Sequence, residues 1–267
     1  AALLELPIDG VFFTGSHATG VKIAQAAAAQ LIPVQLELGG KDPAYAADDV
    51  DPKATAEGLA DGAFYNAGQS CCAVERIYVH EAIYGPFVEA FAAAVDGFVM
   101  GDPAHEDTYL GPLTRAAQIP VIEAQVADAV AKGAKVLRGG HRLDKPGAWF
   151  APTVLIDVDH TMEVMREESF GPVIGIQKVS GDAEAVKLMN DTAYGLTAAV
   201  YTHDQARAQA ILGALDTGTA YWNCCDRVSP RLEWTGRGHS GVGSTLGEVG
   251  IRAFVRPRAW HLRAPQG

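Results

Sequence analysis

Residues 11–38, VFFTGSHATGVKIAQAAAAQLIPVQLEL, decide the fold class of this chain. The short apolar run VFFT favours a strand, Gly15 breaks it, and the alanine-rich segment 17–30 predicts a helix. Pro33 then precedes a second strand-forming run, VQLEL, at 34–38. The stretch therefore predicts one βαβ unit. A lone unit of this kind cannot bury both faces of its sheet, so the sequence reads as the second part of something longer.

Strands and helices alternate in the rest of the chain. Asp51 and Pro52 suit the N-cap and first turn of a helix that extends to Phe64. Further helices are expected at 84–98, 115–132, 183–189 and 205–215, and further strands at 76–80, 135–139, 149–158, 173–179, 197–202 and 219–223. This alternation predicts an α/β fold with a mostly parallel sheet flanked by helices. The glycine-rich segment 236–250 is expected to be loop, and the tail from Ile251 to be extended.

Composition narrows the class of protein. The 267 residues are 48% apolar and 20% charged, which is typical of a globular chain. No apolar run reaches the roughly 20 residues of a membrane helix, and the first residues do not resemble a signal peptide, so we expect a cytoplasmic location. The net charge of −11 argues against nucleic acid and anionic membranes as partners. The one basic segment, 252–263, is better explained as a strand with one exposed face.

The four cysteines form two sequence doublets, Cys71–Cys72 and Cys224–Cys225. Neighbouring Cα atoms lie about 3.8 Å apart, less than the roughly 4.4 Å that a disulfide requires, so neither doublet is expected to close. No C-x-x-C spacing suggests zinc, and we predict free thiols and no metal site.

The turn TGSHATG, residues 14–20, lies between a predicted strand and a predicted helix, where backbone N–H groups favour a phosphate. Its spacing is G-x-x-x-x-G and not the dinucleotide fingerprint G-x-G-x-x-G. A plain strand-to-helix turn capped by Ser16 therefore remains an alternative.

Glu37 ends the second strand between two leucines and before Gly39 and Gly40. Desolvation there would raise its pKa towards that of a general base. Two alternatives stay open. Glu37 lies 22 positions after Gly15, which suits the acid that binds ribose in a Rossmann unit, and it could also be a surface glutamate on an edge strand.

Cys71 follows a predicted helix and a Gly-Gln turn, a place where loop-borne functional residues occur. A small buried core side chain is the alternative interpretation.

Taken together, these motifs resemble the aldehyde dehydrogenase superfamily. The chain has F-T-G-S-x-x-x-G, then L-E-L-G-G-K, then N-x-G-Q-x-C, with 34 residues from Glu37 to Cys71. The likeness continues through E-E-S-F-G-P (167–172), Y-G-L-T-A (194–198) and W-N-C (222–224), and so covers almost the whole chain.

The resemblance implies oxidation of a small-molecule aldehyde to a carboxylic acid with NAD or NADP. Cys71 matches the nucleophile, which forms a thiohemiacetal and then a thioester, and its backbone N–H would be an oxyanion donor. Glu37 matches the base that activates the hydrolytic water. The family's asparagine oxyanion donor would lie upstream of this sequence.

The resemblance also assigns binding residues. The coenzyme would contact the helix start at Gly15 and Ser16, the backbone of Leu38 and Gly39, and the side chains of Glu168 and Phe170. The substrate pocket would contain Ser70, Cys72, Asp226 and Trp234, with Arg227 and Arg231 nearby. An arginine there could bind a carboxylated aldehyde, and a solvated loop arginine is the alternative.

Several features depart from the family pattern or concern its domains. Thr245 takes the place of an acidic residue that helps to position the base in some members. The retained Glu37 favours the hydrolytic branch over the CoA-acylating branch.

The implied domains are a coenzyme-domain remnant (1–38), a catalytic domain (39–240) and a return segment (241–267) whose last strand pairs with a neighbouring subunit in a homo-oligomer. A truncated, non-catalytic homologue is the alternative function.

Overall fold

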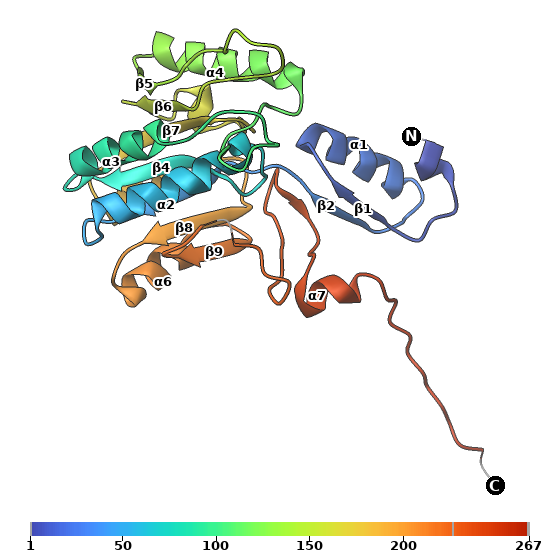
Figure 1. Cartoon of the computed structure of the whole chain (residues 1–267). Helices are drawn as coiled ribbons and strands as arrows, with labels where there is room; N and C mark the ends of the chain where they lie inside the picture. Colours follow the sequence, from blue (N-terminus) through green and yellow to red (C-terminus); the bar gives the residue numbers. More distant parts are fainter. Residues whose placement is uncertain (1, 226, 266–267) are drawn as a thin grey trace.

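Two β-sheets of unequal size organise the chain, which the computed structural model describes over residues 2–225 and 227–265 (Figure 1). The strands are β1 (Val11–Thr14), β2 (Val34–Glu37), β3 (Asp42–Ala46), β4 (Val74–His80), β5 (Lys135–Arg138), β6 (Thr153–Ile156), β7 (Val173–Val179), β8 (Thr197–Tyr201), β9 (Thr219–Trp222) and β10 (Gly241–Val242). The α-helices are α1 (His17–Ala28), α2 (Pro52–Phe64), α3 (Tyr84–Asp96), α4 (Ile119–Ala131), α5 (Asp182–Met189), α6 (Gln205–Gly213) and α7 (Gly247–Arg252). Short 3-10 helices are η1 (Ala2–Glu5), η2 (Tyr65–Gly68), η3 (Ala116–Gln118) and η4 (Glu163–Met165).

The smaller sheet has the order β1-β2-β10 and confirms the predicted βαβ unit. β1 and β2 are parallel, with Thr14 opposite Glu37, and β10 joins β2 in the antiparallel sense. Leu38 packs so closely on α1 that a Cβ on Gly20 would lie 2.7 Å from it. Because side chains alternate along a strand, Gln35 and Glu37 project from the face opposite α1.

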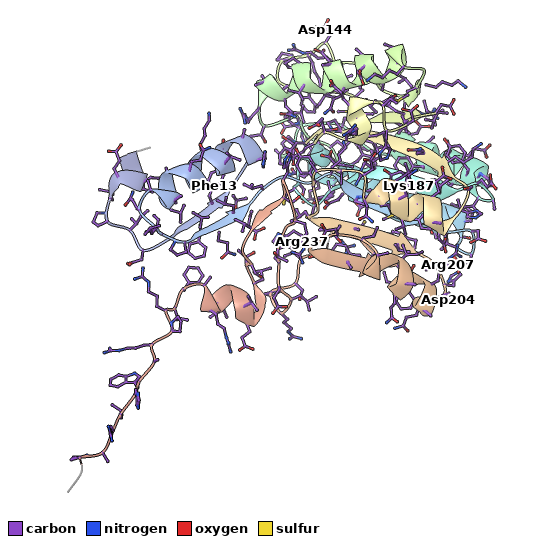
Figure 2. All side chains as sticks on the ribbon, turned by 180° about the vertical axis from the view of Figure 1, so that it is seen from behind. Phe13, Asp144, Lys187, Asp204, Arg207 and Arg237 are labelled. Atoms are coloured by element: carbon purple, nitrogen blue, oxygen red, sulfur yellow. The ribbon has the colours of Figure 1, made fainter. Side chains whose placement is uncertain are left out.

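The larger sheet has the order β5-β6-β7-β4-β3-β8-β9, and only β5 runs antiparallel to its neighbour. Helices α2 and α3 cover one face (Figure 1), while α5, with Lys187, and α6, with Arg207, lie on the other (Figure 2). Arg207 ties these two helices together by donating to Asp182 at 2.6 and 2.7 Å. A parallel sheet needs cover on both faces, and this arrangement confirms the predicted α/β class.

Strand β3 is absent from the elements expected from the sequence. It lies between β4 and β8, and all five of its residues are buried. The strand opens with Asp42 and Pro43, residue types that are rare in central strands. The pairing with β4 is irregular between these two residues, which accommodates the proline. The Asp42 carboxylate accepts hydrogen bonds from Thr197 N (3.1 Å) and Thr197 Oγ1 (2.7 Å), so the acidic side chain is satisfied inside the core.

The C-terminal expectation is only partly correct. The segment predicted as loop contains β10 and most of α7, and Ile251 and Arg252 are helical rather than extended. Phe254 stacks on Phe12 with ring centroids 4.4 Å apart. Arg256 then pairs with Asp9 at 2.8 Å, and the residues from 257 to 265 lead away from both sheets (Figure 1). Residues 253–265 form no strand, so the predicted last strand has no partner within the described chain. Among the described helices, none has the length and apolarity needed to cross a membrane.

Candidate active site

The residues just before the cysteine doublet form a left-handed turn. Asn66, Ala67 and Gly68 have φ angles of 50°, 55° and 69°, a region that non-glycine residues rarely adopt. Asn66 Nδ2 donates to Gln69 O at 2.9 Å, and Gln69 Nε2 donates to Asn66 O at 3.0 Å. Gln69 Oε1 also accepts from Thr114 N at 2.8 Å. The side chains of the N-x-G-Q motif therefore hold the turn that precedes Cys71.

Two glycines let backbone segments pack directly on this turn. A Cβ on Gly68 would lie 2.2 Å from Gly171 O, and a Cβ on Gly40 would lie 2.3 Å from Cys71 O. These distances are far below van der Waals contact, so only glycine suits either position. The cysteine turn is thus in contact with the loop that contains Gly171 and with the segment that joins β2 to β3.

The structure brings four predicted site residues together. Cys72, Trp234 and Leu196 form a small buried apolar cluster, and Cys71 and Leu246 pack at its edge. Cys72 Sγ lies 3.4 Å from Ser70 Oγ. Asp226, the remaining residue predicted for the substrate pocket, lies outside the described residues.

Cys71 and Cys72 have different environments. Both are free thiols, Cys71 partly exposed and Cys72 buried. A hydrogen bond from Cys72 lowers the pKa of Cys71, although burial and the carboxylates of Asp42, Glu168 and Glu37 oppose this effect. The neighbouring thiol therefore stabilises a thiolate on the more accessible cysteine, which is the form that acts as a nucleophile.

Glu37 lies beneath a hairpin that also carries the pocket tryptophan. Burial raises the pKa of Glu37, and hydrogen bonds from Thr245, Gln35 and Trp234 partly offset the rise. Thr245 Oγ1 donates to Glu37 Oε1 at 2.9 Å. Thr245 and Trp234 exchange two backbone hydrogen bonds of 2.7 Å, one in each direction. One pair of hairpin residues therefore connects the Glu37 carboxylate to the apolar cluster beside the cysteine doublet.

Glu168 packs against the two glycines that follow Leu38. Its Oε1 accepts from Gly40 N at 3.0 Å, and a Cβ on Gly39 would lie 2.4 Å from both carboxylate oxygens. Burial and repulsion from Glu75 raise the pKa of Glu168 to about 7. Phe170, predicted beside it, has a φ of +45° and is 37% exposed.

A buried ion pair that the sequence did not reveal supports this loop. Lys41 Nζ lies 2.6 Å from Glu75 Oε2 and 3.1 Å from Ser169 Oγ. Glu75 also accepts from Ser169 N at 2.8 Å and from Phe170 N at 2.9 Å. The signal that could have found it is the pair of charges, Glu75 and Arg76, at the start of an otherwise apolar strand.

The start of α1 has the features of a phosphate site. Gly15 N donates to Glu37 O at 3.0 Å, which places this turn beside the candidate base. Ser16 occupies the N-cap position, but its hydroxyl contacts Thr19 Oγ1 at 3.0 Å and does not cap the helix. The first-turn N–H groups thus receive no side-chain acceptor from Ser16, and they suit the phosphate oxygens of a dinucleotide.

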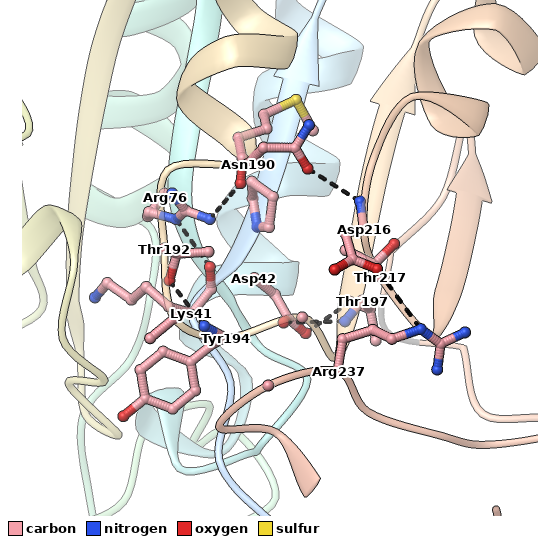
Figure 3. Close-up of a pocket in the computed structure, with 15 residues that line it drawn as sticks. Lys41, Asp42, Arg76, Asn190, Thr192, Tyr194, Thr197, Asp216, Thr217 and Arg237 are labelled. Atoms are coloured by element: carbon pink, nitrogen blue, oxygen red, sulfur yellow. Dashed lines mark hydrogen bonds and ion pairs between the residues drawn. The ribbon is translucent and has the colours of Figure 1, made fainter. Parts of the chain in front are cut away.

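A separate polar cavity lies behind the start of β3 (Figure 3). Its lining does not include Cys71, Glu37 or Trp234. Its buried cations are already engaged, since Lys41 pairs with Glu75 and Arg76 donates to backbone carbonyls, including Met189 O at 3.0 Å. We therefore do not assign the reaction to this cavity. Among the described residues, no group of acidic, histidine and cysteine side chains is arranged to hold a metal ion.

Known proteins share both the sequence motifs and the fold. The model of the Aldehyde dehydrogenase family matches residues 2–259. Aminoaldehyde dehydrogenase 1, peroxisomal, from Pisum sativum is 38% identical over 258 residues, which are 96% of this chain and 51% of the relative. A succinate-semialdehyde dehydrogenase (NADP+) from Deinococcus radiodurans is 39% identical over 251 residues, covering 94% of this chain and 53% of the relative.

Solved structures agree with these relatives. Lactaldehyde dehydrogenase from Escherichia coli superposes with a TM-score of 0.93 and 35% identity, over 96% of this chain and 54% of that one. This chain belongs to the aldehyde dehydrogenase family, as the resemblance in its motifs predicted. It spans about half the length of the curated relatives it matches.

The packing of the cysteine turn predicts that Gly68→Ala destabilises the fold. The added methyl group would clash with Gly171 O. It would also put a residue with a side chain into the left-handed backbone region, which alone costs about 1–2 kcal/mol. Gly58→Ala is the matched control, because Gly58 is helical and open space surrounds its Cβ position. We expect the control to stabilise by about 0.5–1 kcal/mol. Urea unfolding of the natural polypeptide measures both, and equal effects of the two variants would contradict the assignment.

Proposed function

We propose that this chain forms the catalytic part of an enzyme that oxidises an aldehyde to a carboxylic acid with NAD+ or NADP+. The observation that carries the proposal is that one apolar cluster joins a partly exposed thiol, Cys71, to a half-buried carboxylate, Glu37. The hydrogen bond from Cys72 lowers the pKa of Cys71, and burial raises that of Glu37. Trp234 connects the two, because it packs in the thiol cluster and is bonded to the residue that holds Glu37. Opposite pKa shifts of this kind suit a nucleophile and a general base.

Different residues of the chain would carry out the successive steps of the reaction. The Cys71 thiolate adds to the aldehyde carbon, and the Cys71 N–H donates to the oxyanion. A nicotinamide coenzyme would supply the hydride acceptor for the oxidation of this carbon. Glu37 then takes a proton from the water that hydrolyses the Cys71 thioester. Leu196, Cys72 and Trp234 provide the apolar wall that excludes other water.

The coenzyme would be held by residues from both sheets. Gly15 and Ser16 would face the phosphates at the start of α1. The backbone of Leu38 and Gly39 would meet the nicotinamide, and Glu168 and Phe170 would line the same side. We infer the domain division 1–38, 39–240 and 241–267 on this basis, with β10 of the last segment returning to pair with β2. A cytoplasmic location is part of the proposal, although the pea relative is named peroxisomal.

The relatives of this chain are named for chemically different aldehydes. Two relatives with almost the same identity, 38% and 39%, are named for aldehydes of opposite charge, an aminoaldehyde and succinate semialdehyde. Overall similarity therefore does not choose between a cationic and an anionic substrate. Ser70, Cys72, Asp226 and Trp234 remain the residues proposed to contact it.

The first test separates the two adjacent thiols. In the natural polypeptide that carries this chain, Cys71→Ser should lower NAD(P)H production with a panel of aldehydes by at least about a thousandfold, because a neutral hydroxyl replaces the thiolate. Cys72→Ser should retain turnover within about tenfold. Activity that survives Cys71→Ser and disappears in Cys72→Ser would reverse the assignment.

The second test isolates the base. Glu37→Gln should produce one equivalent of NAD(P)H per active site in a rapid burst and then stall, because the amide cannot accept a proton from water. Stopped-flow absorbance follows the burst, and mass spectrometry follows the acyl group on Cys71. Unchanged steady-state turnover would remove Glu37 from this role.

We also propose that the protein is a homo-oligomer and that its tail contributes to the interface. Phe254, Trp260 and Leu262 are 74%, 68% and 81% exposed on a segment without a strand partner in the described chain. Truncation after Arg252 should reduce the mass observed by sedimentation velocity, because these apolar side chains would be lost from the contact. The same mass before and after truncation would exclude the tail from the interface.

A further inference from the structure

The Glu37 carboxylate has one oxygen with a firm partner and one without. Oε1 accepts the hydrogen bond from Thr245 Oγ1. Oε2 is buried and accepts no hydrogen bond of good geometry from the described residues, although Gln35 and Trp234 lie close enough to Glu37 to lower its pKa. The amide nitrogen Gln35 Nε2 is in the same condition. One buried acceptor, Glu37 Oε2, and one buried donor, Gln35 Nε2, thus have no hydrogen bond. Buried polar groups without a partner are rare in proteins, and each needs an explanation.

The strand and the hairpin bring these two groups to the same place. Gln35 and Glu37 are two residues apart on β2, so both side chains project from one face. The hairpin lies over that face, since a Cβ on Gly243 would be 3.0 Å from Gln35 Cγ while Thr245 contacts Glu37. Gln35 is 5% exposed, and its long side chain has little room to turn elsewhere.

We propose that Gln35 and Thr245 are positioning residues that hold the two oxygens of Glu37 with uncharged donors and thereby set the pH range in which it acts as a base. The inference rests on the proposed function, because it concerns the residue that activates water for thioester hydrolysis. Gln35 orients Oε2 with its amide, and Thr245 orients Oε1 with its hydroxyl.

The physical basis is the difference between charged and protonated Glu37. Burial disfavours the carboxylate, and each donated hydrogen bond favours it. Loss of a donor therefore raises the pKa of Glu37 further, so a higher pH is needed to create the base. Both donors are uncharged and do not titrate, unlike a carboxyl group in the position of Thr245.

The titratable neighbours do not compete with this effect. Cys71, on the turn before β4, is the group whose pKa responds to the charge of Glu37. Glu168, across Gly39, interacts with Gly40 N, Glu75 and Lys41. On the hairpin and at the start of α1, His239 and His17 stack on each other, with centroids 3.8 Å apart. Burial alone raises the pKa of Glu37, and the three nearby donors Thr245, Gln35 and Trp234 oppose the rise.

The experiment uses p-nitrophenyl acetate, which tests the base without coenzyme. The Cys71 thiolate attacks the ester carbonyl and p-nitrophenolate leaves, which gives an acetyl thioester. Water then releases acetate and restores the thiol. With the natural polypeptide, the burst reports acylation and the steady state reports deacylation, each measured across a range of pH.

The variants are Thr245→Val, Thr245→Ser, Gln35→Met and the matched control Thr235→Val. Thr235 belongs to the same hairpin and donates to Gly243 O, not to Glu37. Thr245→Val and Gln35→Met should each move the acidic limb of deacylation upward by about one pH unit, a tenfold loss below the limb and none above it. The burst rate should not change. Thr245→Ser and Thr235→Val should retain the parental limb.

The outcomes distinguish this inference from the proposed function. If Glu37→Gln blocks deacylation but neither Thr245→Val nor Gln35→Met moves the limb, the positioning role is wrong and the base assignment stands. A loss of rate that is equal at every pH would indicate a structural defect and would also overturn the role. If Glu37→Gln deacylates normally, the base assignment itself fails, and this inference with it. Should Thr245→Val not fold, Gln35→Met provides the same test.

Discussion

The buried ion pair between Lys41 and Glu75 is the interaction on which the site depends. Burial of two charges costs several kcal/mol per ion unless other polar groups complete their hydrogen bonding. Here Glu75 also accepts from Ser169 N and Phe170 N, and Lys41 also donates to Ser169 Oγ. The pair therefore joins the entry to β3, the start of β4 and the loop before β7 into one unit.

That unit adjoins the two glycine contacts of the cysteine turn. With Lys41 fixed, Gly40 lies against Cys71 O and its N–H reaches Glu168. With Ser169 fixed, Gly171 lies against Gly68 in the cysteine turn. One ion pair, Lys41–Glu75, therefore helps to position Cys71, Glu168 and the loops that contact them. This pair takes no part in the proposed chemistry.

The pKa values of two half-buried glutamates near Cys71, Glu37 and Glu168, are raised in different surroundings. Glu168 has a backbone donor and the nearby Lys41, but burial and repulsion from Glu75 still raise its pKa to about 7. Glu37 has only neutral donors. Both carboxylates disfavour ionisation of Cys71, and the hydrogen bond from Cys72 outweighs them. The second cysteine of the doublet therefore has an electrostatic role beside its place in the pocket wall.

Much of this arrangement could be predicted from local sequence patterns. The βαβ unit and the N-cap at Asp51 come from periodicity and capping, which act over short stretches. The two candidate reactive residues, Cys71 and Glu37, come from the resemblance of their motifs to the family. Strand β3 could not, because its Asp-Pro start contradicts strand propensity and its burial results from pairing on both sides. The contact between Thr245 and Glu37 joins residues 208 positions apart, and only the folded hairpin determines it.

The segment Leu38 to Lys41 crosses from the small sheet to the large one, with Glu37 at one end and the anchor of the cysteine turn at the other. The separation of the proposed base, Glu37, and the proposed nucleophile, Cys71, therefore depends on how the two sheets pack together and not on either sheet alone. A substitution that tilts the small sheet, such as one in the contact between Gly20 of α1 and Leu38, would change that separation without touching a reactive group. The alignment of the two proposed catalytic groups therefore depends on packing remote from the thiol.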